Sequence, residues 1–250
     1  MRPLKTFLIV LAMGTFLSLS AQTADEIITN YLKNTGGVEN WQKLKGIKFN
    51  AKLQTQGLEL PLEIVQLKDG RQMSAAVVQG KEIKQEVYDG KTLWNTNFMT
   101  MKAEASDTET TENFKLNTND FPNPFINYKE KGYTVELLGR ETMEGTETFK
   151  IKLVKEPLTI DGKKEDDIFY YYFDSENFVP IVMESTIRSG PYKGQIQQST
   201  LSDYQEVKGL YFPFSMKGGI KGQSAGQTIN IQSVELNPTV EDSIFKMPEE

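Results

Sequence analysis

The fold is decided between residues 47 and 98, which read IKFNAKLQTQGLELPLEIVQLKDGRQMSAAVVQGKEIKQEVYDGKTLWNTNF. At its start Phe49, Ala51 and Leu53 alternate with polar residues, the period of a strand that buries one face. Similar segments follow, separated by turn pairs that favour tight hairpins. The stretch therefore predicts an antiparallel meander from Ile47 onward, with further strands at 60–68, 72–78, 83–88 and 92–98 and turns at Asp69-Gly70, Gln79-Gly80 and Asp89-Gly90.

Beyond this meander the alternating pattern stops and then resumes. Residues 103–120 are polar and show no strand period, so we predict an exposed loop there, followed by a short helix over the sheet at 125–131. So many short strands joined by hairpin turns indicate one strongly curved sheet or incomplete barrel of about eleven strands, a mainly β fold with few helices. The later strands are expected at 134–140, 148–154, 168–174, 180–188, 194–206, 210–217 and 228–236.

Two features precede the meander. Arg2 and Lys5 stand before an apolar run at 7–19, and small residues end at Ala21, which is typical of a cleaved signal peptide. The run is short for a membrane anchor, which is the alternative interpretation. We expect a signal peptide at 1–21 and one exported domain at 22–250, which opens with a helix capped by Asp25 and a second short turn at 38–44.

Composition excludes several classes of function. The net charge is −6, with no basic cluster, so nucleic acid is not an expected partner. The chain has no cysteine and no histidine, which removes disulfides, thiolate metal sites, a cysteine-linked lipid anchor and catalysis that depends on either side chain. We expect no cofactor, no metal and a monomer that is not lipid-anchored.

The segment Ile168–Phe173 reads IFYYYF and offers aromatic side chains on both faces of a strand. Phe169, Tyr171 and Phe173 share one face, and the intervening residues share the other. One face must meet the core, and the other is a platform, a lid contact or an interface, unless both are buried. The neighbouring Asp166-Asp167 point apart, so we interpret them as part of a solvated hairpin and not as a catalytic pair.

Several motifs resemble those of the periplasmic lipoprotein carriers, the LolA-like family. The segment Asp89–Trp94, DGKTLW, resembles a strand of these carriers, and Val240–Pro248 resembles their closing turn. Gly36-Gly37 with Trp41 and Leu44-Lys45, together with Tyr170–Asp174 and Phe178–Pro180, is similar to lipoprotein-sorting-like exported proteins of Bacteroidetes-type bacteria.

The resemblance implies an incomplete antiparallel barrel around lid helices, with acyl chains held in an apolar cavity between them. The carriers tether the lid with an arginine next to a proline; Arg71 stands in the equivalent region, without the proline. Partners would be lipid or lipoprotein acyl chains and sorting proteins at the inner and outer membranes. Aromatic residues expected to line the cavity are Trp94, Phe121, Phe125, Phe169, Tyr171 and Phe173.

The leading hypothesis is therefore a non-catalytic periplasmic carrier for apolar cargo. The alternative is an interaction module that presents the same scaffold to another envelope protein, without lipid. A hydrolase is the third hypothesis, and only unpaired acidic residues favour it.

Overall fold

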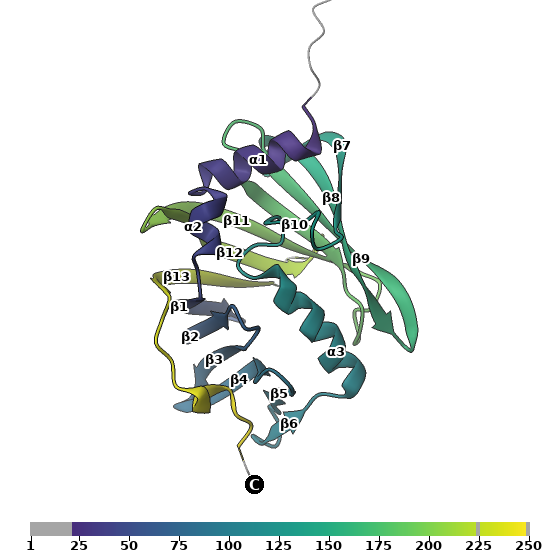
Figure 1. Ribbon diagram of the computed structural model, residues 1–250. Helices are drawn as coiled ribbons and strands as arrows, with labels where there is room; N and C mark the ends of the chain where they lie inside the picture. Colours follow the sequence, from purple (N-terminus) through teal and green to yellow (C-terminus); the bar gives the residue numbers. More distant parts are fainter. Residues whose placement is uncertain (1–21, 224–225, 249–250) are drawn as a thin grey trace, which may run out of the picture.

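The computed structural model describes residues 22–223 and 226–248 and places their strands in one antiparallel sheet (Figure 1). The order across the sheet is β6-β5-β4-β3-β2-β1-β13-β12-β11-β10-β9-β8-β7. Only β1 and β13 are neighbours without being consecutive in sequence, so the chain forms two meanders joined edge to edge. The strands are β1 (Gly46–Thr55), β2 (Leu58–Leu67), β3 (Gln72–Val78), β4 (Lys81–Tyr88), β5 (Leu93–Thr96), β6 (Ala103–Ala105), β7 (Thr134–Met143), β8 (Thr146–Ile160), β9 (Lys163–Asp174), β10 (Pro180–Thr186), β11 (Ile196–Val207), β12 (Leu210–Ile220) and β13 (Gly226–Leu236).

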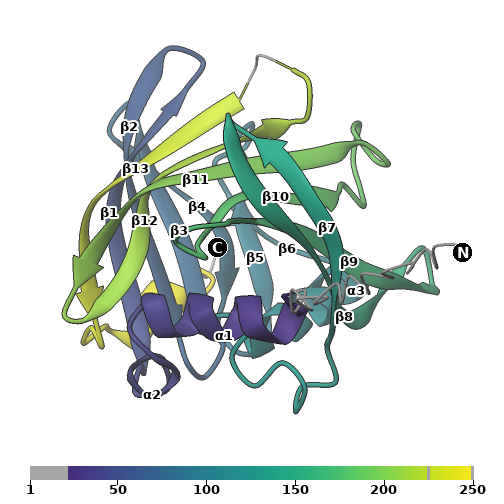
Figure 2. The same ribbon diagram turned by 90° about the horizontal axis from the view of Figure 1, so that it is seen from above.

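The predicted fold class is confirmed: the sheet is strongly curved and does not close on itself (Figure 2). Each of the twelve ranges predicted as strands contains a strand, and thirteen are present in the described chain, so the estimate of about eleven was low. The missed strand is β6, three residues long, which pairs with β5 inside the segment predicted as a loop. Of the three predicted turns, Gln79-Gly80 is a tight primed turn, with φ of +51° and +77°. Asp69-Gly70 and Asp89-Gly90 instead lie in four-residue connections, with positive φ at the glycine and not at the aspartate.

Two helices precede the sheet and lie across one of its faces (Figure 1). Helix α1 (Ala24–Asn34) buries Ile27, Ile28, Tyr31 and Leu32, and α2 (Val38–Gln42) buries Trp41. The predicted cap at Asp25 is wrong. Thr23 is the N-cap, because its hydroxyl accepts from the Glu26 N–H while the Glu26 carboxylate accepts from the Thr23 N–H, a reciprocal capping box.

The middle segment differs most from its prediction. Where a loop was expected, the structure has α3 (Thr108–Asn117) and a 3-10 turn η1 (Thr118–Asp120). The side chain of Asp107 caps α3 by accepting from the Thr110 N–H at 2.7 Å. Where a helix was expected at 125–131, the chain forms a series of turns.

The hairpin of β8 and β9 is longer than predicted. Its turn is Asp161-Gly162, and Asp167 lies within β9 opposite Lys155 of β8. The prediction of a solvated hairpin at Asp166-Asp167 was therefore wrong for Asp167, which is 6% exposed.

The two faces of the sheet carry different cores. The main cluster joins α1 and α2 to residues such as Ile151 of β8, Phe173 of β9 and Phe212 of β12. A second cluster joins β2–β5 to the 3-10 turn η2 (Asp242–Phe245) on the opposite face. We call the face that carries α1, α2 and α3 the inner face, and the face under η2 the outer face. Within the described chain, no helix combines the length and the apolar character needed to cross a bilayer.

Candidate functional site

Strand register shows which side chains line the inner face. Phe49 of β1 lies opposite Ile64 of β2 and Val234 of β13. Leu53 lies opposite Leu60 on one side and Ile229 on the other, and Ile229 lies opposite Met216 of β12. Because cross-strand partners point to the same side of a sheet, these residues form continuous apolar rows across neighbouring strands.

The rows form an apolar belt that helices leave partly exposed. Ala51, Leu62 and Ile231 are its buried centre, and the side chains around them keep part of their surface accessible. Among the described residues the belt draws its members from β1, β2, β3, β12 and β13 and from no helix. We define the apolar belt by these partly exposed residues: Phe49, Leu53, Ile64, Ala76, Phe214, Met216, Ile229 and Val234.

Beside the belt, α1 packs on an aromatic cluster. The centre of the Phe125 ring lies 4.9 Å from the ring centre of Tyr171, 5.6 Å from that of Phe173 and 6.0 Å from that of Tyr31, and each pair is edge-to-face. Phe169 continues the row at 6.3 Å from Tyr171. The predicted shared face of Phe169, Tyr171 and Phe173 is confirmed, and it is the inner face.

Polar contacts fix α1 over this cluster. The Asn123 amide donates to the Tyr31 hydroxyl at 2.6 Å, and burial raises the pKa of Tyr31 to about 12. At the start of the helix Asp25 accepts from Lys129 at 2.7 Å and also from the Tyr128 hydroxyl. The hydrogen bond from Lys129, and to a lesser extent that from Tyr128, holds the pKa of Asp25 below its usual range. Helix α1 is therefore attached at two points to residues 121–133.

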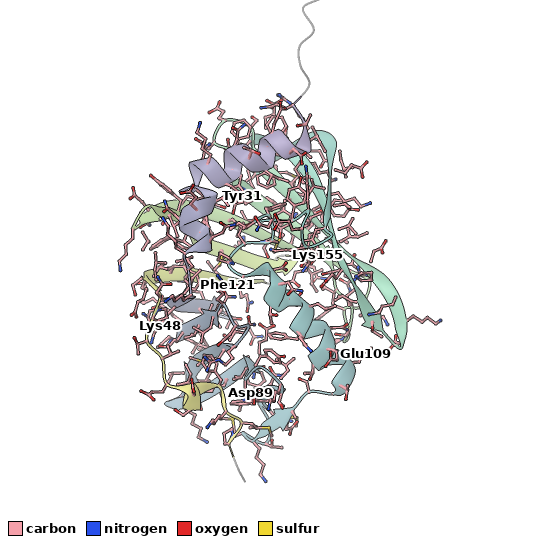
Figure 3. All side chains as sticks on the ribbon, viewed as in Figure 1. Tyr31, Lys48, Asp89, Glu109, Phe121 and Lys155 are labelled. Atoms are coloured by element: carbon pink, nitrogen blue, oxygen red, sulfur yellow. The ribbon has the colours of Figure 1, made fainter. Side chains whose placement is uncertain are left out.

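An ion-pair network lies between α1 and α3, where Figure 3 labels Lys155 and Phe121. The Lys155 ammonium is 2.8 Å from Asp120 and 3.0 Å from Asp167, and it donates to Asn117 at 3.2 Å. It also lies 4.6 Å from the centre of the Phe169 ring. The network joins β8 and β9 to the end of α3. Sequence reasoning missed it.

Helix α3 is held mainly by polar contacts. It has no buried residue, although Phe114 contacts the ring of Tyr88 at 5.5 Å. The Asn113 side chain exchanges two hydrogen bonds with the backbone of Thr159, at 2.6 and 2.8 Å. Glu109 accepts from the backbone N–H groups of Asp161 and Gly162 at 2.9 Å each, and Figure 3 shows it on α3 beside this hairpin. Helices usually gain stability by burying an apolar face, whereas α3 is held by these polar contacts and one ring contact.

The other two predicted site residues lie elsewhere. Trp94 is 2% exposed and packs with Val65 and Val87 in the outer-face cluster. Arg71 pairs with Asp242 at 2.7 Å and lies 5.2 Å from the centre of the Phe245 ring. The structure thus brings five of the six aromatic residues to the main cluster, separates Trp94 from them, and places Arg71 at η2 and not at a helix of the inner face. In the described chain, no three acidic side chains gather in a way that could hold a metal.

Known proteins with a similar fold are found among solved structures. No protein-family model matches the chain, and no curated protein matches it by sequence. Among solved structures, a LolA superfamily protein from Nitrosomonas europaea matches over 90% of this chain and 98% of its own, with a TM-score of 0.52 and 14% identity. A domain assigned as an outer membrane lipoprotein-sorting protein from Vibrio parahaemolyticus matches over 88% of this chain and 94% of its own, with a TM-score of 0.52 and 11% identity. A DUF1329 family protein from Desulfovibrio piger matches over 89% of this chain and 96% of its own, with a TM-score of 0.53 and 12% identity.

At identities of 11–14% these likenesses concern the fold. They span most of this chain and nearly all of each matched chain. The resemblance read from Asp89–Trp94 is confirmed at that level: this chain has the fold of LolA-superfamily and lipoprotein-sorting structures.

Proposed function

We propose that this chain is a non-catalytic carrier that holds acyl chains, of a lipoprotein or of another lipid, on the inner face of its sheet. The apolar belt carries the proposal. Eight apolar side chains stay partly exposed next to a buried core, and adjoining apolar side chains on a curved sheet are the kind of surface that ligand sites use. Burying an acyl chain against it gains about 0.8 kcal/mol per CH₂.

The site proposed here extends from the belt to the aromatic cluster. Phe121, Phe169 and Tyr171, which are partly buried, form its wall below α1, and the fully buried Phe125 and Phe173 pack behind them. Trp94 is left out because it lies on the outer face. Helices α1, α2 and α3 cover the inner face, and α3 is the movable one, because polar contacts and not buried side chains attach it.

This function places the protein in the periplasm, exported by the signal peptide expected at 1–21, which lies outside the described residues. The fold is that of lipoprotein-sorting structures, which supports lipoprotein acyl chains as cargo. A carrier of lipoproteins would need one partner at the inner membrane to load it and one at the outer membrane to receive the cargo.

Neighbouring positions on β3 give a matched test. Ala76 belongs to the belt, whereas Val77 points to the outer face and is 41% exposed. We expect Ala76→Glu to weaken binding of a fluorescent fatty acid at least tenfold, because a carboxylate would enter the apolar site. Val77→Glu should bind like the unchanged protein, and thermal melts should show both variants folded.

Native mass spectrometry of protein purified from its own envelope would identify the bound lipid. Equal binding by the two variants, or no lipid uptake by the unchanged protein, would reject the carrier. Capture of a protein partner by lipid-free protein, unaffected by Ala76→Glu, would then support the interaction module.

A further inference from the structure

The turn between β5 and β6 exposes three large apolar side chains in four residues. Phe98 is 67% exposed, Met99 is 95% exposed and Met101 is 37% exposed. In Figure 1 these two strands lie at the end of the molecule far from α1. We call residues 97–102 the apolar tip. Single exposed apolar residues are common, but a group of three at one projecting turn is not explained by packing.

The tip is a turn in which five backbone N–H groups, those of residues 97 and 99–102, are hydrogen-bonded within the turn. The Asn97 side-chain oxygen accepts from the N–H groups of Met99 at 2.8 Å and Thr100 at 3.1 Å. The Asn97 N–H donates to the Lys102 carbonyl, and the Met101 N–H donates to the Asn97 carbonyl, each at 2.8 Å. The Lys102 N–H donates to the Thr100 hydroxyl. A turn bonded in this way holds Phe98 and Met99 outward.

We propose that the apolar tip inserts into the surface of a lipid bilayer. Entry into a bilayer interface is easier for a segment with few backbone N–H groups that need water, and five N–H groups of the tip are already bonded within the turn. A stable protein interface takes about 20–30 residues from each partner, whereas the tip offers three apolar side chains on a projecting turn. A lipid bilayer can accommodate three apolar side chains on one turn more readily than the surface of a second folded protein can.

The charges near the tip are of both signs, so we attribute its binding to apolar contact and not to charge attraction. Glu104, whose carboxylate accepts from the Thr100 hydroxyl, follows Lys102 in sequence. The chain as a whole carries a net charge of −6, which disfavours anionic surfaces. Insertion should therefore occur with neutral lipid and persist at high salt, because salt screens charge but does not weaken apolar burial.

Flotation of the purified protein with phosphatidylcholine vesicles, without added cargo, tests this inference independently of the carrier function. We expect the unchanged protein to float with the vesicles at low and at molar salt. Phe98→Ser/Met99→Ser should lower the partition coefficient at least tenfold. Leu58→Ser is the matched control, because Leu58 is 55% exposed at a different hairpin, and it should leave partition unchanged.

Thermal melts would verify that both variants fold, and Met99→Glu is the substitute if the double variant does not. Three results would overturn the proposal: no flotation of the unchanged protein, equal flotation of the double variant, or binding confined to phosphatidylglycerol vesicles and abolished by salt. A dimer in solution that the double variant converts to monomer, with vesicle binding unchanged, would assign the tip to a second copy of the chain instead.

Discussion

The indole N–H of Trp94 donates a hydrogen bond of 2.9 Å to the backbone carbonyl of Phe245, 151 residues later in the sequence. The Lys84 ammonium donates to the neighbouring carbonyl of Ile244 at 3.3 Å. Together these contacts hold η2 against the outer face, where Phe245 is 1% exposed. The outer face of β2–β5 is thus packed against η2.

Replacing Trp94 by Ala should lower the free energy of unfolding by about 3–5 kcal/mol, the range for a buried aromatic side chain that is truncated. Trp94→Phe keeps most of the apolar volume and loses the hydrogen bond to Phe245, so it should cost less. Urea unfolding of the two variants measures both values. A melt unchanged in Trp94→Ala would contradict the burial described here.

Arg71 gives a prediction that separates its two possible roles. Its guanidinium pairs with Asp69 and Asp242, and such partly exposed pairs contribute about 0–1 kcal/mol. We therefore expect Arg71→Ala to speed amide hydrogen exchange around residues 242–247 with little change in global stability. Exchange across α3 should stay as it is; faster exchange in α3 alone would restore the lid-tether role.

The buried network around Lys155 should be costly to break. Lys155→Met leaves Asp167, 6% exposed, without its cation, and breaking a buried ion pair from one side costs about 3–5 kcal/mol. Adding Asp120→Asn and Asp167→Asn to Lys155→Met should recover much of that loss, because no unpaired charge remains. Denaturant unfolding of the single and triple variants checks this, and equal losses in the two would argue against charge as the cause.

Local sequence pattern predicted the elements whose stability is local. The alternation at Phe49, Ala51 and Leu53 and the Gly-containing turns are properties of neighbouring residues, and the strands they predicted are present. Helix α3 was not predicted because its sequence, TETTENFKLN, has no apolar stripe. What holds it is the Asp107 cap and the contacts of Glu109 and Asn113 with a hairpin about 50 residues away.

The candidate site was predictable only in part, for the same reason. Alternation within β9 was enough to group Phe169, Tyr171 and Phe173 on one face. The face of Trp94 depends on a register shift in the pairing of β3 with β4 and on contact with η2, which no local pattern reveals. Asp167 was misread because the hairpin turns at Asp161-Gly162, which places Asp167 opposite Lys155.

Buried tyrosines predict a loss of stability in alkali. Burial raises the pKa of Tyr31 from 10 to about 12, so the folded state keeps this proton where the unfolded state has lost it. The stabilisation is complete below pH 10 and declines as pH rises from 10 through 12, by about 1.4 kcal/mol per pH unit for one group. Burial also raises the pKa of Tyr171, which adds to the decline.

Unfolding measured between pH 9 and 12 would test this, with Tyr31→Phe as the comparison. The variant should lose some stability at neutral pH, because the Asn123 amide loses its acceptor, yet its stability should fall less steeply above pH 10. Parallel curves for the two proteins would exclude Tyr31 as a source of the pH dependence.

The attachment of α3 gives the last prediction. Glu109→Gln with Asn113→Ala removes both hydrogen bonds to the backbone of Thr159. It also removes one of the two that Glu109 accepts from the N–H groups of Asp161 and Gly162, because an amide NH₂ group cannot accept. The ring contact of Phe114 with Tyr88 is left in place. We expect amide exchange across residues 108–117 to become at least tenfold faster, which corresponds to about 1.4 kcal/mol of local opening free energy. The global melting temperature should change by a few degrees at most. Glu112→Gln, an exposed position on the same helix, is the control and should leave exchange unchanged.

The same double variant also tests whether α3 moves to admit a ligand. If it does, the double variant should take up a fluorescent fatty acid faster at an unchanged final occupancy. Faster exchange without faster uptake would show that the ligand enters elsewhere, and unchanged exchange would show that packing of Phe114 on Tyr88, not the polar contacts, holds the helix.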